Sequence, residues 1–166
     1  MGTDAHRLAA ADTPVTIGVL TVSDSRGEDE DVNGDYLKER IVAAGAVLGG
    51  YAVVRDEPDD VRATVERFAE SCQIVVVNGG TGISRRDSTY DALAGMLEKP
   101  LPGFGELFRM LSWEQVGSAA MLSRATAGTF RGTVVISTPG SPKAVRLAWE
   151  KLIEPELHHL AWELTR

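Results

Sequence analysis

The chain has 166 residues, 43% hydrophobic and 25% charged, a composition typical of one globular domain with a core of its own. Its 17 Lys and Arg are outnumbered by 24 Asp and Glu, and the formal net charge of -7 argues against sequence-independent binding of nucleic acid. The longest apolar runs, such as residues 74–77, end far short of the roughly 20 residues that cross a bilayer, so we expect no membrane partner.

Cysteine and histidine content limits the metal and redox chemistry. Cys72 is the only cysteine, which excludes an intramolecular disulfide, and three histidines are too few for a Cys/His zinc cluster. We therefore expect any metal to be held by oxygen. The first 13 residues lack the basic start and apolar centre of a signal peptide, so we expect a cytoplasmic protein. We expect a flexible segment over 1–14 and a single domain over 15–166.

Apolar runs and amphipathic segments alternate along the chain. The runs predict four strands, at 15–22, 47–54, 74–77 and 133–138, and the β-branched runs at 15–22 and 74–77 are typical of buried strands of a parallel sheet. Helical spacing predicts helices over 36–44, over 58–68 with Asp59 as a cap, and around 90–97 and 104–117. A last helix begins with Ser141 as N-cap and is broken or kinked at Pro155. This order predicts an α/β fold, a three-layer α/β/α sandwich with a mostly parallel central sheet.

Small, polar or glycine-rich segments follow three of these strands. They comprise Ser23, Asp24 and Ser25; Gly79, Gly80, Thr81 and Gly82; and Pro139, Gly140 and Ser141. Ligands of open α/β sheets bind beyond the carboxyl ends of the strands, and glycine lets backbone N–H groups approach an anion closely. Neither standard nucleotide fingerprint is present, so residues 79–82 fit a phosphate loop and a tight strand-to-helix turn about equally well. If they bind a ligand, a bulky residue at Gly80 should abolish binding and leave folding largely intact.

Charged residues sharpen this prediction. Arg85, Arg86 and Asp87 directly follow the glycine-rich turn, a pattern that suits phosphate together with a divalent metal, although Asp87 could also be an N-cap or an ion-pair partner of the arginines. Asp56 could supply a second carboxylate or cap a helix. Lys143, in the first turn of a helix, is poorly placed for the helix dipole and indicates an anion nearby.

Other polar residues favour structural roles. Ser84 does not lie in a GxSxG elbow, which argues against a Ser-His-Asp triad. His158 and His159, among the leucines of the last helix, are interpreted as solvent or interface residues.

Five motifs in order resemble the molybdenum cofactor biosynthesis family, and specifically the MoaB/Mog proteins. They are TVSDSR, VVRDEPDDVR, VVNGGTGISRRDST, PLPGFGELFRMLSWEQVGSAAMLSRATAG and STPGSPKAV, and the match spans about residues 15–164. The fourth motif is similar to the MoaB branch in particular. Ser25, Asn33, Ser88 and Tyr90 depart from the usual pattern, and none removes a charge from the expected site.

The resemblance implies molybdopterin adenylylation, in which Mg²⁺, ATP and molybdopterin give adenylyl-molybdopterin and pyrophosphate. It implies that Asp56 and Asp87 are the catalytic and metal-binding residues. It implies substrate binding by Ser23, Asp24, Ser25, Gly79, Gly80, Thr81, Gly82, Ser112, Pro139, Gly140, Ser141 and Lys143, with Glu106 and Arg124 as weaker matches.

Two functions remain open at this point. One is the adenylyltransferase; the other is a protein of the same pathway that binds or delivers molybdopterin without turning over ATP. The resemblance also implies a homotrimer or homohexamer, and it leaves room for a molybdenum insertase as a partner.

Overall fold

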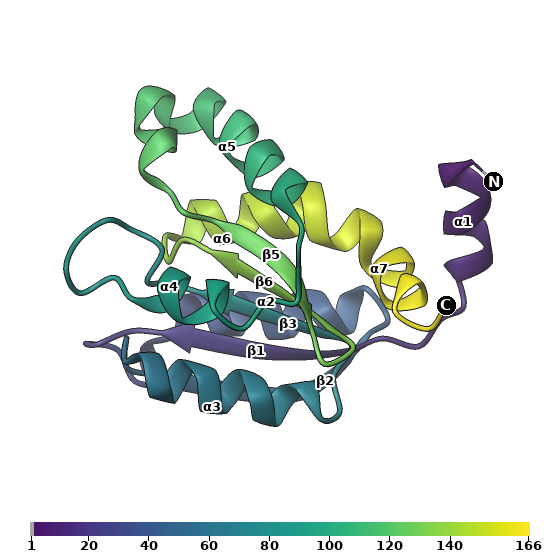
Figure 1. Cartoon of the computed structure of the whole chain (residues 1–166), viewed down its shortest axis with the longest axis horizontal. Helices are drawn as coiled ribbons and strands as arrows, with labels where there is room; N and C mark the ends of the chain where they lie inside the picture. Colours follow the sequence, from purple (N-terminus) through teal and green to yellow (C-terminus); the bar gives the residue numbers. More distant parts are fainter. Residues whose placement is uncertain (1) are drawn as a thin grey trace.

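Six strands form one sheet in this computed structural model, which describes residues 2–166 (Figure 1). They are β1 (Thr16–Val22), β2 (Val47–Val54), β3 (Ile74–Asn78), β4 (Lys99–Pro100), β5 (Thr126–Phe130) and β6 (Thr133–Thr138). Their spatial order is β2-β1-β3-β6-β5-β4. The pairs β1–β2, β1–β3 and β3–β6 are parallel, whereas β5 runs antiparallel to both β6 and β4. The mostly parallel sheet expected from the sequence is confirmed.

Seven α-helices occur in the described residues: α1 (Thr3–Ala10), α2 (Val32–Ala43), α3 (Pro58–Ala69), α4 (Thr89–Ala94), α5 (Pro102–Val116), α6 (Pro142–Ala148) and α7 (Leu157–Glu163). Shorter helical turns are η1 (Glu28–Glu30), η2 (Gly117–Leu122), η3 (Trp149–Ile153, a π-helix) and η4 (Glu154–Glu156). None of the helices in residues 2–166 has the length and apolar character needed to span a bilayer.

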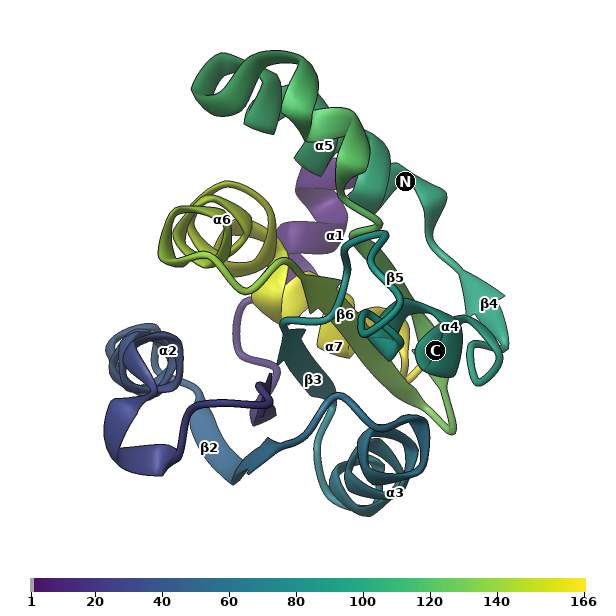
Figure 2. The same cartoon turned by 90° about the vertical axis from the view of Figure 1, so that its left-hand side faces the viewer.

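Side chains of each strand alternate between two cores, as the two-residue period of a strand requires. Val19 and Val76 join the core beneath α2, α5, α6 and α7, whereas Leu20 and Val77 join the core beneath α3 and α4. Figure 2 shows the two helical layers on opposite faces of the sheet. The three-layer sandwich is therefore confirmed.

The start of the last helical stretch follows the predicted signals, whereas the start of α3 does not. Ser141 caps α6 by accepting a hydrogen bond from the Ala144 N–H at 3.2 Å, and Pro155 lies in the break before α7. Asp59 was expected to cap α3 but lies inside its first turn, and Glu57 takes the N-cap position without a side-chain capping bond.

The segment over 1–14 that we expected to be flexible contains helix α1, which packs against α7 (Figure 1). Arg7 forms an ion pair with Glu156, and His6 Nδ1 lies 3.4 Å from Glu163 Oε1. The partners that order this segment come from the other end of the chain.

The sheet also has two strands that the sequence did not predict, β4 and β5. The edge strand β4 has only two residues, and Pro100 pairs with Gly128 of β5. A Cβ atom at Gly128 would lie 2.8 Å from the Lys99 carbonyl oxygen, so the close approach of the two strands requires glycine.

Candidate active site

The loops after β1, β3 and β6 meet at one edge of the sheet, because these strands are parallel. The Gly79 N–H donates to the Thr138 carbonyl at 3.0 Å, which joins two of the loops. Between them lies a cavity of about 490 Å³. It is lined by Thr21, Val22, Ser23, Arg26, Asn33, Asn78, Gly79, Gly80, Asp87, Gly140, Ser141 and Pro142.

A second cavity, of about 660 Å³, adjoins the first, and Ser141 and Pro142 line both. Its wall includes three more of the expected binding residues, Ser112, Pro139 and Lys143. The remaining expected residues, Asp24, Ser25, Asp56, Thr81 and Gly82, lie on neither wall. No Cys or His lines either cavity, so their walls carry neither an imidazole base nor a thiol nucleophile.

The glycine-rich turn needs glycine for its own geometry. Gly79 and Gly80 have φ angles of +106° and +69°, in the region that L-residues rarely adopt. A Cβ atom at Gly79 would overlap the Val22 carbonyl oxygen. One at Gly80 would overlap Thr89 Oγ1 and lie 2.7 Å from Asp56 Oδ2. The expectation that a bulky residue at Gly80 would leave folding largely intact is therefore wrong, because the buried neighbours leave no space for it.

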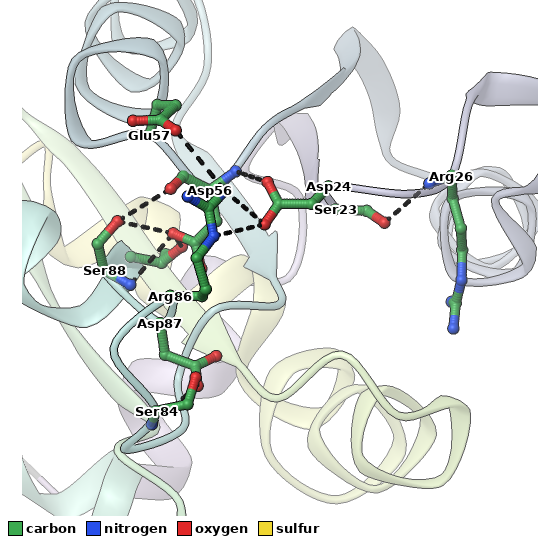
Figure 3. Close-up of polar contacts among 10 residues, drawn as sticks. Ser23, Asp24, Arg26, Asp56, Glu57, Ser84, Arg86, Asp87 and Ser88 are labelled. Atoms are coloured by element: carbon green, nitrogen blue, oxygen red, sulfur yellow. Dashed lines mark hydrogen bonds and ion pairs between the residues drawn. The ribbon is translucent and has the colours of Figure 1, made fainter.

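Asp56 is a buried carboxylate that binds the start of α4, not of α3. Its Oδ1 accepts hydrogen bonds from Ser88 N at 3.2 Å, Ser88 Oγ at 2.8 Å and Thr89 Oγ1 at 3.1 Å (Figure 3). Ser88, the N-cap of α4, makes no side-chain capping bond of its own. The second oxygen, Oδ2, accepts no hydrogen bond from the described residues and lies beside Gly80.

Asp24, in the loop after β1, contacts residues of the loops after β2 and β3. Arg86 Nη2 donates to Asp24 Oδ2 at 2.8 Å, and the Asp56 N–H donates to Asp24 Oδ1 at 3.1 Å. The hydrogen bond from Arg86, and then that from the Asp56 N–H, lower the pKa of Asp24, so its carboxylate stays ionised. Arg86 Nη2 also lies 3.7 Å from Glu57 Oε1. Arg86 therefore pairs with Asp24 and Glu57 rather than with Asp87.

Asp87 lines the first cavity and is half-buried. Its Oδ2 accepts hydrogen bonds from the Ser84 N–H at 3.1 Å and from the Ser84 hydroxyl. Figure 3 shows the carboxylate turned toward Ser84 and away from Asp56. Its Oδ1 accepts no hydrogen bond from any described residue, which leaves one oxygen available to a ligand.

Arg124 holds the loop of residues 82–91 in place. Its guanidinium donates to the Gly82 carbonyl at 3.0 Å, to the Asp87 carbonyl at 3.1 Å and to the Asp91 carboxylate at 3.1 Å. Arg124 therefore fixes the backbone at Gly82 and at Asp87, whose carboxylate was expected to be catalytic. Glu106, the other weaker match, lines a separate cavity of about 470 Å³ together with Arg124.

Two asparagines of the first cavity were not predicted as site residues. Asn33 Nδ2 donates to Asn78 Oδ1 at 3.0 Å and to the Gly140 carbonyl at 2.8 Å, and Asn78 Nδ2 donates to Thr21 Oγ1 at 3.0 Å. This buried network ties α2 to the ends of β1 and β3 and to the loop after β6. The sequence signal for Asn78 as a site residue is its position as a polar residue directly after the apolar run over 74–77.

Comparison with known proteins places the chain in a family. The family model described as "Probable molybdopterin binding domain" matches residues 18–159. Molybdenum cofactor biosynthesis protein B of Bacillus subtilis is 44% identical over 169 residues, covering 100% of this chain and 99% of that protein.

Solved structures agree with this match. A crystal structure of a molybdenum cofactor biosynthesis protein B has a TM-score of 0.89 at 46% identity, covering 92% of this chain and 97% of that one. The tungsten cofactor synthesizing protein MoaB from Pyrococcus furiosus has a TM-score of 0.84 at 38% identity, covering 93% and 99%. The resemblance seen in the sequence motifs is confirmed, and the chain belongs to the MoaB/Mog family of molybdenum cofactor biosynthesis proteins.

Proposed function

We propose that this protein is a molybdopterin adenylyltransferase that acts in the cytoplasm. The observation that carries the proposal is the pair of adjoining cavities at the sheet edge, which share Ser141 and Pro142. Two cavities side by side suit a reaction between two anions, for which a protein must chiefly position the reactants and offset their charge. The names of the relatives support the pathway.

In the proposed reaction, an oxygen of the terminal phosphate of molybdopterin forms a bond to the α-phosphorus of ATP. The bond from that phosphorus to the bridging oxygen breaks, and pyrophosphate leaves with the electron pair. No covalent enzyme intermediate is needed, which agrees with cavity walls that carry no Cys or His. We further propose that the adenylylated product accepts molybdate from a molybdenum insertase partner.

The residues divide this work between binding and charge. Gly79 and Gly80 line the first cavity, and their positive φ angles, which glycine adopts readily, shape the turn at its wall. Arg26 on the first cavity and Lys143 on the second supply positive charge to the two anions. Arg124, bound to two loop carbonyls, keeps Asp87 at the cavity wall.

Asp87 fits Mg²⁺ by its place on the cavity wall, whereas Asp56, which lies on neither wall, would reach the ion only after a movement of the loop between them. Mg²⁺ takes one or two carboxylates together with substrate phosphates, and each of these residues has one oxygen that accepts no hydrogen bond from the described residues. When bound, the ion supplies positive charge that offsets the phosphates of ATP.

Release of pyrophosphate is the measurement that tests the proposal. We expect the purified protein to release pyrophosphate from ATP only when molybdopterin and Mg²⁺ are both present, because the pterin phosphate is the nucleophile. Matched controls omit one component at a time, and adenylyl-molybdopterin is identified by mass. Pyrophosphate release without molybdopterin would indicate plain ATP hydrolysis and contradict the proposal.

The second candidate is a protein that binds or delivers molybdopterin without turning over ATP. The orientation of Asp87 favours it, since this carboxylate is hydrogen-bonded to Ser84 and turned away from Asp56 (Figure 3). Tight molybdopterin binding with no pyrophosphate release under any condition would establish this function instead.

We also propose that the chain forms a homotrimer or homohexamer. Helix α5 and turn η2 expose a group of large apolar side chains, here called the α5 apolar surface: Leu107, Met110, Trp113, Val116, Met121 and Leu122. Trp113 is 59% exposed and Met121 78%, and large apolar side chains gathered on one helix and the turn after it suit an interface between copies.

Light scattering tests this assembly. We expect a mass several times the 17.8 kDa of one chain, and a Trp113→Asp variant should shift the mass toward 17.8 kDa because a carboxylate is costly to bury there. A matched Leu8→Asp variant on α1, also at an exposed apolar residue, should keep the mass of the wild type. A wild-type mass near 17.8 kDa at micromolar concentration would contradict the assembly.

A further inference from the structure

Two histidines and a glutamate converge far from the sheet edge, where α1 packs against α7. One ligand atom from each of His6, His159 and Glu163 lies within 4.8 Å of the other two. His6 Nδ1 is 3.4 Å and His159 Nε2 is 3.5 Å from Glu163 Oε1. His159 was expected at a solvent or interface position, and no sequence pattern connects it with His6, because the two residues lie at opposite ends of the chain.

The imidazole of His159 is oriented by a neighbouring carboxylate. Its Nδ1 lies 2.8 Å from Glu156 Oε2, and donation from Nδ1–H leaves the lone pair on Nε2. His159 Nε2 is buried and has no hydrogen-bond partner in residues 2–166. Buried polar atoms without a partner are rare, and a histidine held by a carboxylate through its other nitrogen is the usual arrangement of a metal ligand.

The spacing of the ligand atoms suits a tetrahedral ion. With metal–ligand bonds of about 2.0–2.1 Å, the ligands of a tetrahedral zinc ion lie roughly 3.3 Å apart. The distances of 3.4 Å and 3.5 Å to Glu163 Oε1 are close to that value. Only the two imidazoles would have to approach one another, by a small movement of the His6 side chain on α1.

We propose that His6, His159 and Glu163 bind a zinc ion, with a water molecule as fourth ligand and Glu156 holding His159 in place. Two His and one carboxylate form a donor set that zinc prefers, so this site departs from the expectation that any metal would be held by oxygen alone. The site is independent of the proposed adenylylation, because none of its residues lines the two cavities at the sheet edge. The ion joins the first helix of the chain to the last.

Neighbouring charges are compatible with this site. Arg166 Nη1 lies 2.9 Å from Glu163 Oε1 and can move to Oε2, which has no partner in the described residues. Arg7 pairs with Glu156 Oε1, while Glu156 Oε2 faces His159. The Trp162 ring packs against His6 and His159, with centroid distances of 5.2 Å and 6.2 Å, and limits the rotation of both imidazoles.

The test titrates zinc alone into the full chain after treatment with a chelator, in competition with a chromophoric zinc indicator. We expect one zinc ion per chain in the wild type. His6→Gln and His159→Gln should each weaken binding by more than about 100-fold, since even residues that only orient a ligand are worth 10–100-fold. His158→Gln is the matched control, because His158 Nδ1 contacts the Thr13 carbonyl at 2.8 Å outside the cluster, and it should bind zinc as the wild type does.

Amide hydrogen exchange gives a second readout. Zinc should slow exchange in helix α1 of the wild type and of His158→Gln, and leave it unchanged in His6→Gln. Circular dichroism checks that each variant folds. If His159→Gln does not fold, the zinc affinity of His6→Gln alone tests the proposal. Absence of zinc binding, or equal affinity in wild type and His6→Gln, overturns the proposal; the latter result would place zinc elsewhere, for example at the carboxylates of the sheet edge.

Discussion

In an Asp87→Asn variant, the rate of adenylylation is expected to fall on the order of 10²-fold or more, whereas the affinity for molybdopterin should change little. Asparagine keeps the size of the side chain, and its carbonyl oxygen can still accept the hydrogen bond from the Ser84 N–H. The negative charge at the cavity wall is lost. If Asp87 holds Mg²⁺, that charge matters most when electrons redistribute between the phosphates, and least when the pterin docks.

The matched control for this charge is Asp59→Asn. Asp59 is exposed in the first turn of α3, where it pairs only with Arg62 at 3.3 Å, so its loss should leave turnover nearly unchanged. Pyrophosphate release and molybdopterin binding are measured on both variants. Equal turnover in Asp87→Asn and the wild type would remove Asp87 from the chemistry and strengthen the function of binding or delivery.

A Gly80→Ala variant is expected to lose both stability and molybdopterin affinity. Its Cβ would overlap Thr89 Oγ1 and crowd Asp56 Oδ2, in addition to the cost of a positive φ. We expect unfolding in urea to show a loss of roughly 3 kcal/mol or more, the sum of left-handed strain and overpacking. At a temperature where the variant stays folded, its affinity for molybdopterin should fall by more than about tenfold. That is the effect of losing one hydrogen bond between the displaced turn and a phosphate.

A Gly45→Ala variant separates the cost of a positive φ angle from the cost of overpacking. Gly45 has a φ of +76° and nothing within 4 Å of an added Cβ, so this variant should lose only about 1–2 kcal/mol and bind molybdopterin normally. Equal losses of stability at the two positions would show that contacts of the added Cβ atom with Thr89 and Asp56 do not destabilise the Gly80→Ala variant. Unchanged affinity in folded Gly80→Ala would remove the glycine-rich turn from the binding site.

Four of the six strands were predictable from their apolar runs; β1, β3 and β6 are buried as such runs suggest, whereas β2 lies at the edge of the sheet and has no fully buried residue. Strand β5 (TAGTF) was not, since it contains two small residues, and Gly128 is required by the close approach of β4 rather than by strand propensity. Helix α1 was missed for a related reason. Its residues Arg7 and His6 contact Glu156 and Glu163 from the other end of the chain, and no local pattern reveals those contacts.

The position of the candidate site was predictable to a similar degree. Parallel strands bring their carboxyl ends to one edge, so Ser23, Gly79 and Ser141 could be expected together, and they line one cavity. The roles within the loops were less accessible. Asp56 binds the start of a helix more than thirty residues away, and Arg124 binds backbone carbonyls, which are the same in every sequence and leave no signature.

The two-residue strand β4 has a consequence for how copies of this chain can aggregate. Fibril growth through a sheet needs a long row of free N–H and C=O groups on the outer strand. Here that row is two residues long, and Pro100 has no N–H to contribute. At this end the sheet is a poor template for an incoming strand, so contacts between copies there depend on side chains.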